Sequence, residues 1–414
     1  MSVVAPSGSY SVSIVIGGRF HAFDLARELQ ARHLLEQLIT SYPKRKTREF
    51  KVPDERVTSF PLVYLQRALE KLSPRVASAS LSHLNESFGR LAPLALQRRP
   101  PSIVHAWSGY AHRSLRWAKQ HGVPTVLERS SSHILTQFEI LATEHERLGV
   151  RWKQTAARWI DRDLAEYELA DLIAVPSLFA KQSFVERGFA ESRLLHAPFG
   201  TDLSSFSPGA KSDNAFRVVY AGQLAIRKGI HDLIRAFQLA QVVNSELCLV
   251  GGATAETPVV LREAREGVRL VGHVPQAALV REYRAGTVFV MQSVEEGLAY
   301  VQAQAMATGL PLICTTNTGG EDLLRMSGDR IAVHGGEIHE YPAGYMVPIR
   351  RPDLTAQCLR WLATDRDLLQ SKRDAAISIA GRELGWGRYT ETVVAGYDRL
   401  IGRGEVFHPA NAEA

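Results

Sequence analysis

Strand-like apolar runs alternate with amphipathic helical stretches along most of this 414-residue chain, in two series that begin alike. Each series opens on a strand, turns at glycine and continues into a helix. The first strand is Val12–Ile16, followed by Gly17 and Gly18, and the second is Phe216–Ala221, followed by Gly222. A strand–helix alternation of this kind indicates parallel sheets covered by helices. The sequence therefore predicts an α/β protein built from two similar Rossmann-like halves.

Further elements are expected within each half. In the first half we predict a helix over residues 23–35 and strands over residues 102–105, 124–128 and 172–175. In the second half we predict a helix over residues 231–240 and strands over residues 247–250, 268–271, 287–291 and 311–314. Residues 200–211 are rich in Gly, Ser and Pro and are expected to link the halves, whereas residues 374–402 are expected to be helical.

Composition and cysteine usage narrow the class of protein. A hydrophobic content of 45% and a charged content of 22% are ordinary for a globular protein, and 414 residues exceed one typical core. Cys248, Cys314 and Cys358 lie far apart, so we expect buried thiols rather than a disulfide framework or a metal site. With no secretion signal and no apolar run approaching about 20 residues, we expect a cytoplasmic protein.

The densest basic cluster is the segment YPKRKTREFK, residues 42–51, in a chain of net charge +6. Its bases are Lys44, Arg45, Lys46, Arg48 and Lys51. The chain carries no zinc-finger spacing and no aromatic RNP strand, so nucleic acid is not the expected partner. Bases interleaved with aromatic residues suit the surface of an anionic membrane. The alternative is an ordinary solvated loop, which is what most charge runs are.

The most informative segment for function is MQSVEEGLAYVQAQAMATGLP, residues 291–311. A predicted strand leads into a loop with Glu296 and Gly297, and a short helix is predicted from about Ala299. The first turn of a helix has unpaired N–H groups and a positive dipole end, which together favour phosphate. The Glu296 carboxylate can accept hydrogen bonds from hydroxyl groups. The pattern favours a sugar nucleotide, although many α/β sheets contain similar strand–loop–helix units.

This segment resembles the donor-binding signature of the family 4 retaining glycosyltransferases, also called group 1 glycosyltransferases. Glu296-Gly297 match the start of the family's EGFG loop, Leu298-Ala299 replace its Phe-Gly, and Gln304 replaces a second Glu. A second match is the KG element at Lys228-Gly229. There Gln223 stands where the family has an arginine, and Arg227 lies beside the lysine. The two glutamines remove charge from donor-binding positions.

The resemblance implies the glycosyltransferase B architecture, in which two Rossmann-like domains face each other. Residues 1–205 are then the acceptor-binding domain, residues 206–380 the nucleotide-sugar domain, and residues 381–414 a helix that crosses back to the first domain, with a tail. The implied activity is retaining transfer of a sugar from a UDP- or GDP-sugar to a glycan or lipid-linked acceptor, in bacterial cell-surface polysaccharide or lipopolysaccharide synthesis. A protein at the inner face of the cytoplasmic membrane would fit this role.

The resemblance also implies site residues. Catalytic roles fall to His133, Glu296 and Lys228. Donor contacts fall to Gly17, Gly18, Arg227, Lys228, Gly272, His273, Val274, Glu296, Gly297, Leu298, Ala299, Tyr300 and Gln304. Acceptor contacts fall to Arg19, His105, Trp107 and Arg129, which lie near the carboxyl ends of predicted strands. No Asp-x-Asp motif lies near a predicted strand end, so we expect neither a metal nor another cofactor.

Two alternative functions remain open at this stage. One is a degenerate relative that binds a sugar nucleotide or a partner without catalysis. The other is a different enzyme on the same architecture, such as a sugar phosphorylase or a sugar-nucleotide epimerase. Acceptor-dependent release of free nucleotide diphosphate separates transfer from both.

Overall fold

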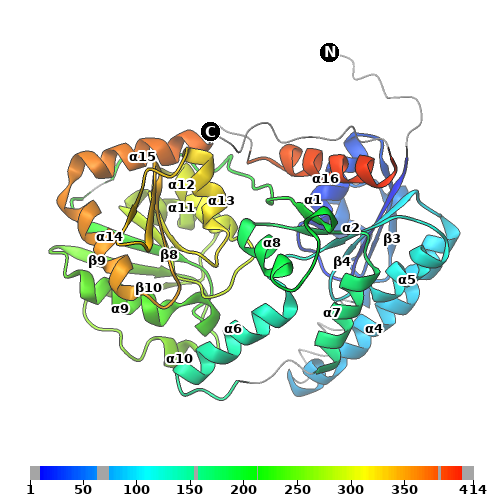
Figure 1. Cartoon of the computed structure of the whole chain (residues 1–414), viewed down its shortest axis with the longest axis horizontal. Coiled ribbons are helices and arrows are strands. Elements are labelled where there is room, and N and C mark those ends of the chain that lie inside the picture. Colours follow the sequence, from blue (N-terminus) through cyan, green and yellow to red (C-terminus); the bar gives the residue numbers. More distant parts are fainter. Residues whose placement is uncertain (1–9, 63–73, 153–156, 212, 381–383, 403–414) are drawn as a thin grey trace, which may run out of the picture.

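The computed structural model describes residues 10–62, 74–152, 157–211, 213–380 and 384–402. The first nine residues, the start of the predicted crossing segment at 381–383 and the last twelve residues lie outside the described part. Two sheets with their helices stand side by side in Figure 1, joined near residues 200–211. The three cysteines are free and buried, as the sequence predicted.

The first sheet has seven parallel strands in the order β3-β2-β1-β4-β5-β6-β7. Its strands are β1 (Val12–Ile16), β2 (Leu35–Thr40), β3 (Val57–Ser59), β4 (Ile103–Trp107), β5 (Thr125–Glu128), β6 (Leu172–Val175) and β7 (Leu194–His196). Its helices are α1 (Ala22–Ala31), α2 (Lys44–Arg48), α4 (Pro74–Arg98), α5 (His112–Gln120), α6 (Ile134–Arg147), α7 (Ala157–Leu169) and α8 (Leu178–Val185). The five residues of β1 are all buried, as expected for the centre of a sheet covered on both faces.

The second sheet has eight strands in the order β10-β9-β8-β11-β12-β15-β14-β13. Its strands are β8 (Phe216–Ala221), β9 (Ser245–Val250), β10 (Val268–Gly272), β11 (Val288–Met291), β12 (Leu312–Thr315), β13 (Ala332–His334), β14 (Ile338–Tyr341) and β15 (Gly344–Val347). Its helices are α9 (Ile230–Ala240), α10 (Thr257–Val260), α11 (Gln276–Ala285), α12 (Tyr300–Ala307), α13 (Gly320–Ser327), α14 (Pro352–Thr364) and α15 (Arg366–Ala380). Only the pairs β13–β14 and β14–β15 are antiparallel. Two parallel-dominated α/β sheets confirm the predicted fold class.

The last helix, α16 (Trp386–Leu400), leaves the second sheet and packs on the first. It contacts α1 and β7, and Figure 1 shows it in red above the blue start of the chain. Tyr389, Val393 and Tyr397 on this helix are buried. Gly396 leaves room for Leu195, because a Cβ there would overlap the leucine side chain. The predicted return of the chain to the first domain is therefore confirmed, with α16 as the crossing helix and α15 remaining on the second domain.

Several parts of the fold differ from the sequence-based prediction, which did not include the strands β2, β3, β7 and β15. The helix expected over residues 23–35 ends at Ala31, because His33 adopts a φ of 57° and turns the chain into β2. The hairpin β13–β14 was not predicted at all. Its turn uses Gly335 and Gly336, both at positive φ, which glycine adopts without steric cost. Among the described helices, none combines the length and apolar character needed to cross a bilayer.

Candidate active site

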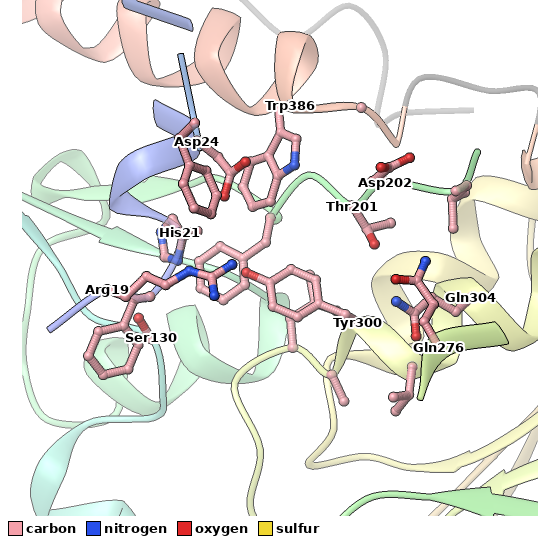
Figure 2. A pocket seen from close by; sticks show the side chains of 18 of the residues that line it. Arg19, His21, Asp24, Ser130, Thr201, Asp202, Gln276, Tyr300, Gln304 and Trp386 are labelled. Carbon is pink, nitrogen blue, oxygen red and sulfur yellow. The ribbon is translucent and has the colours of Figure 1, made fainter. Parts of the chain in front are cut away.

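A cleft of about 1310 Å³ lies between the two domains, at the edge where strands of both sheets end. From the first domain it is lined by the loop after β1 and the start of α1. From the second it is lined by the loops after β8 and β11 and by the start of α12. Residues 199–203 of the link and Trp386 complete the wall. Figure 2 shows Arg19 and Tyr300 pointing toward each other across this space, with Gln276 and Gln304 farther along it.

Lys228 is placed in the cleft by a tight turn. A short 3-10 helix, Ile226–Lys228, ends at Gly229, whose φ of 63° then begins α9. A Cβ on Gly229 would overlap the carbonyl group of Gln292, so glycine is required at this point. The turn thereby brings Lys228 into contact with the loop that follows β11. This local geometry explains the Lys-Gly pair seen in the sequence.

Two cations share one carboxylate in the cleft. Nη1 of Arg227 lies 2.9 Å from Oε2 of Glu296, and Nζ of Lys228 pairs with the same oxygen. Burial lowers the pKa of Lys228, and the charge of Glu296 acts against that shift. For Arg227, burial is outweighed by the nearby Glu296 and Glu295, which raise its pKa. Glu295 and Glu296 together balance the two cations, so a bound anion would compete with these carboxylates for Arg227 and Lys228.

The start of α12 also faces the cleft. Leu298, Ala299 and Tyr300 line it, and no side chain caps the helix at Ala299. The first N–H groups of the helix are thus free of a side-chain partner. One turn later, Gln304 lines the cleft opposite Thr201, as Figure 2 shows. The predicted donor residues Arg227, Lys228, Glu296, Leu298, Ala299, Tyr300 and Gln304 are brought together in one wall.

Gly297 serves a different purpose from the one expected. The sequence analysis placed it among the donor contacts. In the structure a Cβ at this position would overlap the carbonyl oxygen of Ser130 from the first domain. Gly297 therefore allows the two domains to touch, and it does not line the cleft.

A set of hydrogen bonds beside Gly297 joins the two domains, and we call Glu295, Ser131, Ser132 and Gln137 the latch. Oε1 of Glu295 accepts from the hydroxyls of Ser131 (2.6 Å) and Ser132 (2.8 Å), and Oε2 accepts from Nε2 of Gln137 (2.9 Å). The Glu295 side chain is fully buried. A buried carboxylate with three side-chain donors holds the loop after β5 against the loop after β11.

A buried polar network supports His21, which the sequence analysis missed. Nε2 of His21 lies 3.1 Å from Oε1 of Glu128, and Oε2 of the same carboxylate contacts His105 at 3.1 Å and the hydroxyl of Tyr389 at 3.0 Å. Nδ1 of His105 lies 2.6 Å from the hydroxyl of Tyr397. His21 itself lines the cleft. The sequence did hold a signal for His21, because it stands two residues after Arg19 and shortly beyond the end of a predicted strand.

The charge state of this network follows from its contacts. Burial would raise the pKa of Glu128, but the positive charge of His21 and hydrogen bonds from His105 and His21 hold the pKa of Glu128 at about 2. Burial lowers the pKa of His105 despite its bond to Glu128. Glu128 is therefore an anion that orients two imidazole rings, one of which reaches the cleft.

Three of the four predicted acceptor residues are buried away from the cleft. His105 and Trp107 are inside β4 rather than after it, and they stack on one another beneath α16. Arg129 is engaged by Asp163 (3.2 Å), Gln137 (2.9 Å) and the carbonyl of Ser132 (2.9 Å). These three residues hold the first domain together, and only Arg19 of the predicted acceptor set lines the cleft.

His133 is likewise not at the cleft. Its Nδ1 accepts a hydrogen bond from the N–H of Leu135 and caps α6, while the ring packs among Tyr167, Phe184 and Phe189. The side chain is 1% exposed, and burial together with the charge of Arg129 lowers its pKa to about 4. As a buried ring that caps α6 outside the cleft lining, His133 gains no support from its position for the expected catalytic role, which stays a prediction.

The remaining residues expected to contact the donor lie in different places relative to the cleft. Gly17 packs against the ring of Tyr110, and Gly18 lies near Phe20, which lines the cleft. Gly272 ends β10, and His273 and Val274 follow it; none of the three lines the cleft, although Gln276, shortly after them, does. Their proposed contact with a nucleobase stays a prediction.

The basic segment lies next to the cleft. Its aromatic residues, Tyr42 and Phe50, pack edge-on against Phe23 rather than facing solvent. Two of its bases pair with local carboxylates, Lys46 with Glu49 and Arg48 with Asp54. Lys51 is exposed and lines the cleft. Binding of this segment to a membrane stays a prediction.

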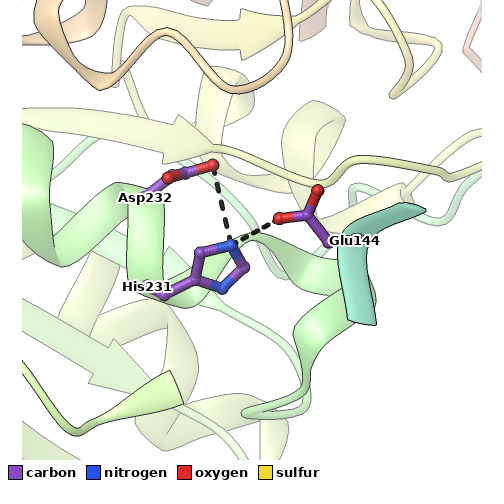
Figure 3. A group of neighbouring side chains, drawn as sticks. All are labelled: Glu144, His231 and Asp232. Carbon is purple, nitrogen blue, oxygen red and sulfur yellow. Dashed lines mark hydrogen bonds and ion pairs between the residues drawn. The ribbon is translucent and has the colours of Figure 1, made fainter. Parts of the chain in front are cut away.

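One group among the described residues has the spacing of a metal site, namely Glu144, His231 and Asp232 (Figure 3). A guanidinium nitrogen of Arg147 lies 2.6 Å from Glu144 and 2.7 Å from Asp232, and Arg350 binds the other oxygen of Glu144 at 2.6 Å. Arginine thus supplies the cation that these carboxylates need. The group ties α6 of the first domain to α9 of the second and acts as an interdomain ion-pair cluster.

Comparisons with known proteins agree with this geometry. A family model described as "Glycosyl transferase 4-like domain" matches residues 17–200, and one described as "Glycosyl transferases group 1" matches residues 215–365. The D-inositol 3-phosphate glycosyltransferase 1 of Catenulispora acidiphila is 28% identical over 261 residues, which is 56% of this chain and 58% of that protein. The O-antigen chain mannosyltransferase B of Escherichia coli is 24% identical over 325 residues, 72% of this chain and 83% of that protein. HepE of Anabaena, solved with UDP-glucose, superimposes with a TM-score of 0.63 at 15% identity, over 94% of this chain and 100% of that one.

Proposed function

The chain belongs to the group 1 glycosyltransferases of glycosyltransferase B architecture, and on that premise we propose that it transfers a sugar from a UDP- or GDP-sugar to a glycan or lipid-linked acceptor. The transfer retains the anomeric configuration and needs no metal ion. The observation that carries the proposal is the pair of cations, Arg227 and Lys228, held by Glu296 at the open start of α12.

The donor is proposed to lie along the wall formed by the second domain. As the bond to the sugar breaks, negative charge grows on the diphosphate, and preorganised cations stabilise that charge. Arg227, Lys228 and the N-terminus of α12 are the groups that supply this stabilisation. Glu296 exchanges some of its contact with the two cations for a sugar hydroxyl when the donor binds. Gln304 is placed to hydrogen-bond the ribose through its amide.

The acceptor is proposed to enter from the first domain, past Arg19 and His21. Its hydroxyl attacks on the face that the diphosphate leaves, and the proton passes to the departing phosphate. No separate general base is then required. Closure at the latch excludes water, which suppresses hydrolysis of the donor.

The biological setting is proposed to be bacterial cell-surface polysaccharide or lipopolysaccharide synthesis at the inner face of the cytoplasmic membrane. An O-antigen mannosyltransferase among the relatives supports the polysaccharide setting. The exposed bases Lys44, Arg45, Arg48 and Lys51, beside the cleft, support a location near anionic lipid.

The test is nucleotide release by the purified protein with a panel of UDP- and GDP-sugars, beginning with UDP-glucose. Bacterial membrane extract serves as acceptor, and Glu296→Ala is the control. Acceptor-dependent release from one donor, lost in the variant and with the sugar recovered on the acceptor, supports transfer. Release of sugar phosphate without nucleotide, or bound nucleotide with no turnover on any donor, contradicts it.

A further inference from the structure

A second cavity, of about 250 Å³, lies in the first domain between α4, α5 and α7. Its volume is below the roughly 300–1,000 Å³ of sites for drug-sized ligands, so it suits one charged group or sugar unit. We call it the arginine pocket, because Arg113, Arg158 and Arg162 all line it. It is separate from the active-site cleft and has no role in the function proposed so far.

The cations of the arginine pocket exceed the carboxylates that face them. Among the described residues, Arg158 has no ion pair and lies over the ring of Trp159, with its Cζ 5.0 Å from the ring centre. Arg113 contacts Glu86 only at 3.6 Å, and that carboxylate is shared with Arg90 at 2.7 Å. Two guanidinium groups are therefore available to an incoming anion.

The third arginine is fixed in place by its surroundings. Arg162 also lies over the ring of Trp159, with its Cζ 4.4 Å from the ring centre. Its guanidinium group binds Asp163 at 2.9 Å. Gly109 has a φ of 91°, and a Cβ on it would come 3.2 Å from a guanidinium nitrogen of Arg162. The absence of a side chain at Gly109 thus leaves the arginine room beside the loop after β4.

The remaining carboxylate of the pocket, Glu166, lies 3.9 Å from Arg162 and is held mainly by backbone N–H groups. Both oxygens of Glu166 accept backbone N–H groups, from Gly109 at 2.7 Å, Ala111 at 2.9 Å and His112 at 3.0 Å. Its side chain is fully buried. Burial, with the nearby Asp163, raises the pKa of Glu166 to about 7, so its negative charge is incomplete at neutral pH.

The arginine pocket adjoins the acceptor side of the cleft. Tyr110 forms one of its walls, and the ring of the same residue packs against Gly17, where a Cβ would overlap it. Gly17 begins the turn that leads to Arg19, which lines the cleft. The pocket and the turn that leads to Arg19 therefore share the ring of Tyr110 as a common wall.

We propose that the arginine pocket binds a negatively charged group of the acceptor, a carboxylate or a phosphate, and thereby selects acidic acceptors. Guanidinium groups bind both anions through paired hydrogen bonds. The ring of Tyr110 adds an apolar wall beside the three guanidinium groups. This assignment rests on the function proposed above, because it gives the pocket a role in acceptor choice.

The test measures binding of D-glucuronate, inorganic phosphate and D-glucose to the full chain by calorimetric titration at low salt. Glucuronate and glucose share a ring and differ in the carboxylate. We expect at least one anion to bind saturably, glucose not to bind, and Arg113→Gln and Arg158→Gln each to weaken the anion at least fivefold. Lys119→Gln, which removes an exposed charge from α5 outside the pocket, is the matched control and should stay within twofold.

Phosphate can also bind the cations of the active-site cleft, so Lys228→Ala is measured in parallel. Anion binding that persists in Lys228→Ala and is lost in Arg158→Gln supports the arginine pocket. Loss in Lys228→Ala with retention in Arg158→Gln overturns it, as does equal binding of glucose or no binding of either anion. A preference for glucuronate indicates a sugar-acid acceptor, and a preference for phosphate indicates a phosphorylated one.

The two proposals fail separately. If no nucleotide sugar is turned over but the anion binds as expected, the transfer function is wrong and the binding site stands. If transfer is observed and Arg158→Gln leaves the KM for the acceptor unchanged, the binding site is wrong and the transfer function stands. Support requires a raised acceptor KM in Arg158→Gln with little change in kcat.

Discussion

Tyr389 donates its hydroxyl to Oε2 of Glu128 across 3.0 Å, although 261 residues separate them in the chain. The bond joins the crossing helix α16 to the end of β5. Because the other oxygen of Glu128 holds His21, a residue of the active-site cleft is positioned through the last helix of the described structure. The crossing helix therefore contributes to the site as well as to the fold.

Glu128→Gln should lower the free energy of unfolding by about 2–4 kcal/mol, because the amide cannot accept from His21, His105 and Tyr389 together. Tyr389→Phe removes one donor and should cost about 1 kcal/mol. Urea unfolding at pH 7 measures both. A change below about 0.5 kcal/mol in Glu128→Gln would mean that the network contributes nothing to stability.

The stabilisation by Glu128 should disappear in acid. Its pKa is about 2 in the folded protein against an ordinary 4.5, so the unfolded chain takes up this proton first. The contribution is complete above about pH 4.5 and is lost as the pH falls toward 2. The difference in stability between the native protein and Glu128→Gln should thus shrink by about 2 kcal/mol between pH 7 and pH 3. If the stability difference between the native protein and Glu128→Gln does not change with pH, Glu128 is not a buried anion.

Gly297→Ala should prevent full domain closure, because the added methyl group would overlap the carbonyl of Ser130. We expect turnover to fall at least tenfold, with a larger radius of gyration by solution scattering in the presence of nucleotide. Gly252→Ala is the matched control, since nothing lies within 4 Å of its added methyl group. Equal turnover in the two variants would show that closure does not depend on this contact.

Lys228→Ala should weaken binding of the donor's nucleotide diphosphate by about ten- to a hundredfold, the usual loss when a charged hydrogen-bonding partner is removed. Titration calorimetry with UDP and GDP measures the change. Arg235→Ala removes an exposed cation from α9, the helix that follows Lys228, and should bind nucleotide like the native protein. If both variants bind alike, Lys228 is not a diphosphate contact.

Glu296→Ala should separate binding from turnover. Removing this carboxylate frees Arg227 and Lys228, so the nucleotide diphosphate should bind at least as tightly as before. Turnover should fall by about tenfold to a thousandfold, because the sugar loses its positioning group. Glu296→Gln keeps the shape and tests the charge alone. Unchanged turnover in Glu296→Ala would remove this residue from the reaction.

Much of the fold could be predicted because its central strands are short apolar runs bounded by glycine or polar residues. The strands β1, β6 and β8 match their predicted ranges residue for residue. By contrast, β2 was not predicted and its first residue, Leu35, was given to the preceding helix, since nothing in the sequence marks the positive φ of His33. The edge hairpin β13–β14 is too short and too polar to stand out.

The donor wall was predictable and the acceptor side was not, for a physical reason. Lys228 and Glu296 each stand directly before a glycine, Gly229 and Gly297, so the pattern is local in the sequence. The roles expected of His105 and Trp107 depended on where β4 ends, and it runs two residues farther than predicted, which buries both. Three serines and an arginine separate β5 from His133, so that residue begins α6 instead of facing the cleft.

The position of α16 in the chain has a consequence for synthesis. The last strand of the first sheet ends at His196, and the helix that covers this domain begins at Trp386. At the usual rate of about 5–20 residues per second, the ribosome needs roughly 10–40 s to make the intervening chain. During that time the apolar surface of the first domain that Tyr389 and Tyr397 later cover is exposed. We expect chaperones to bind the nascent chain at this surface.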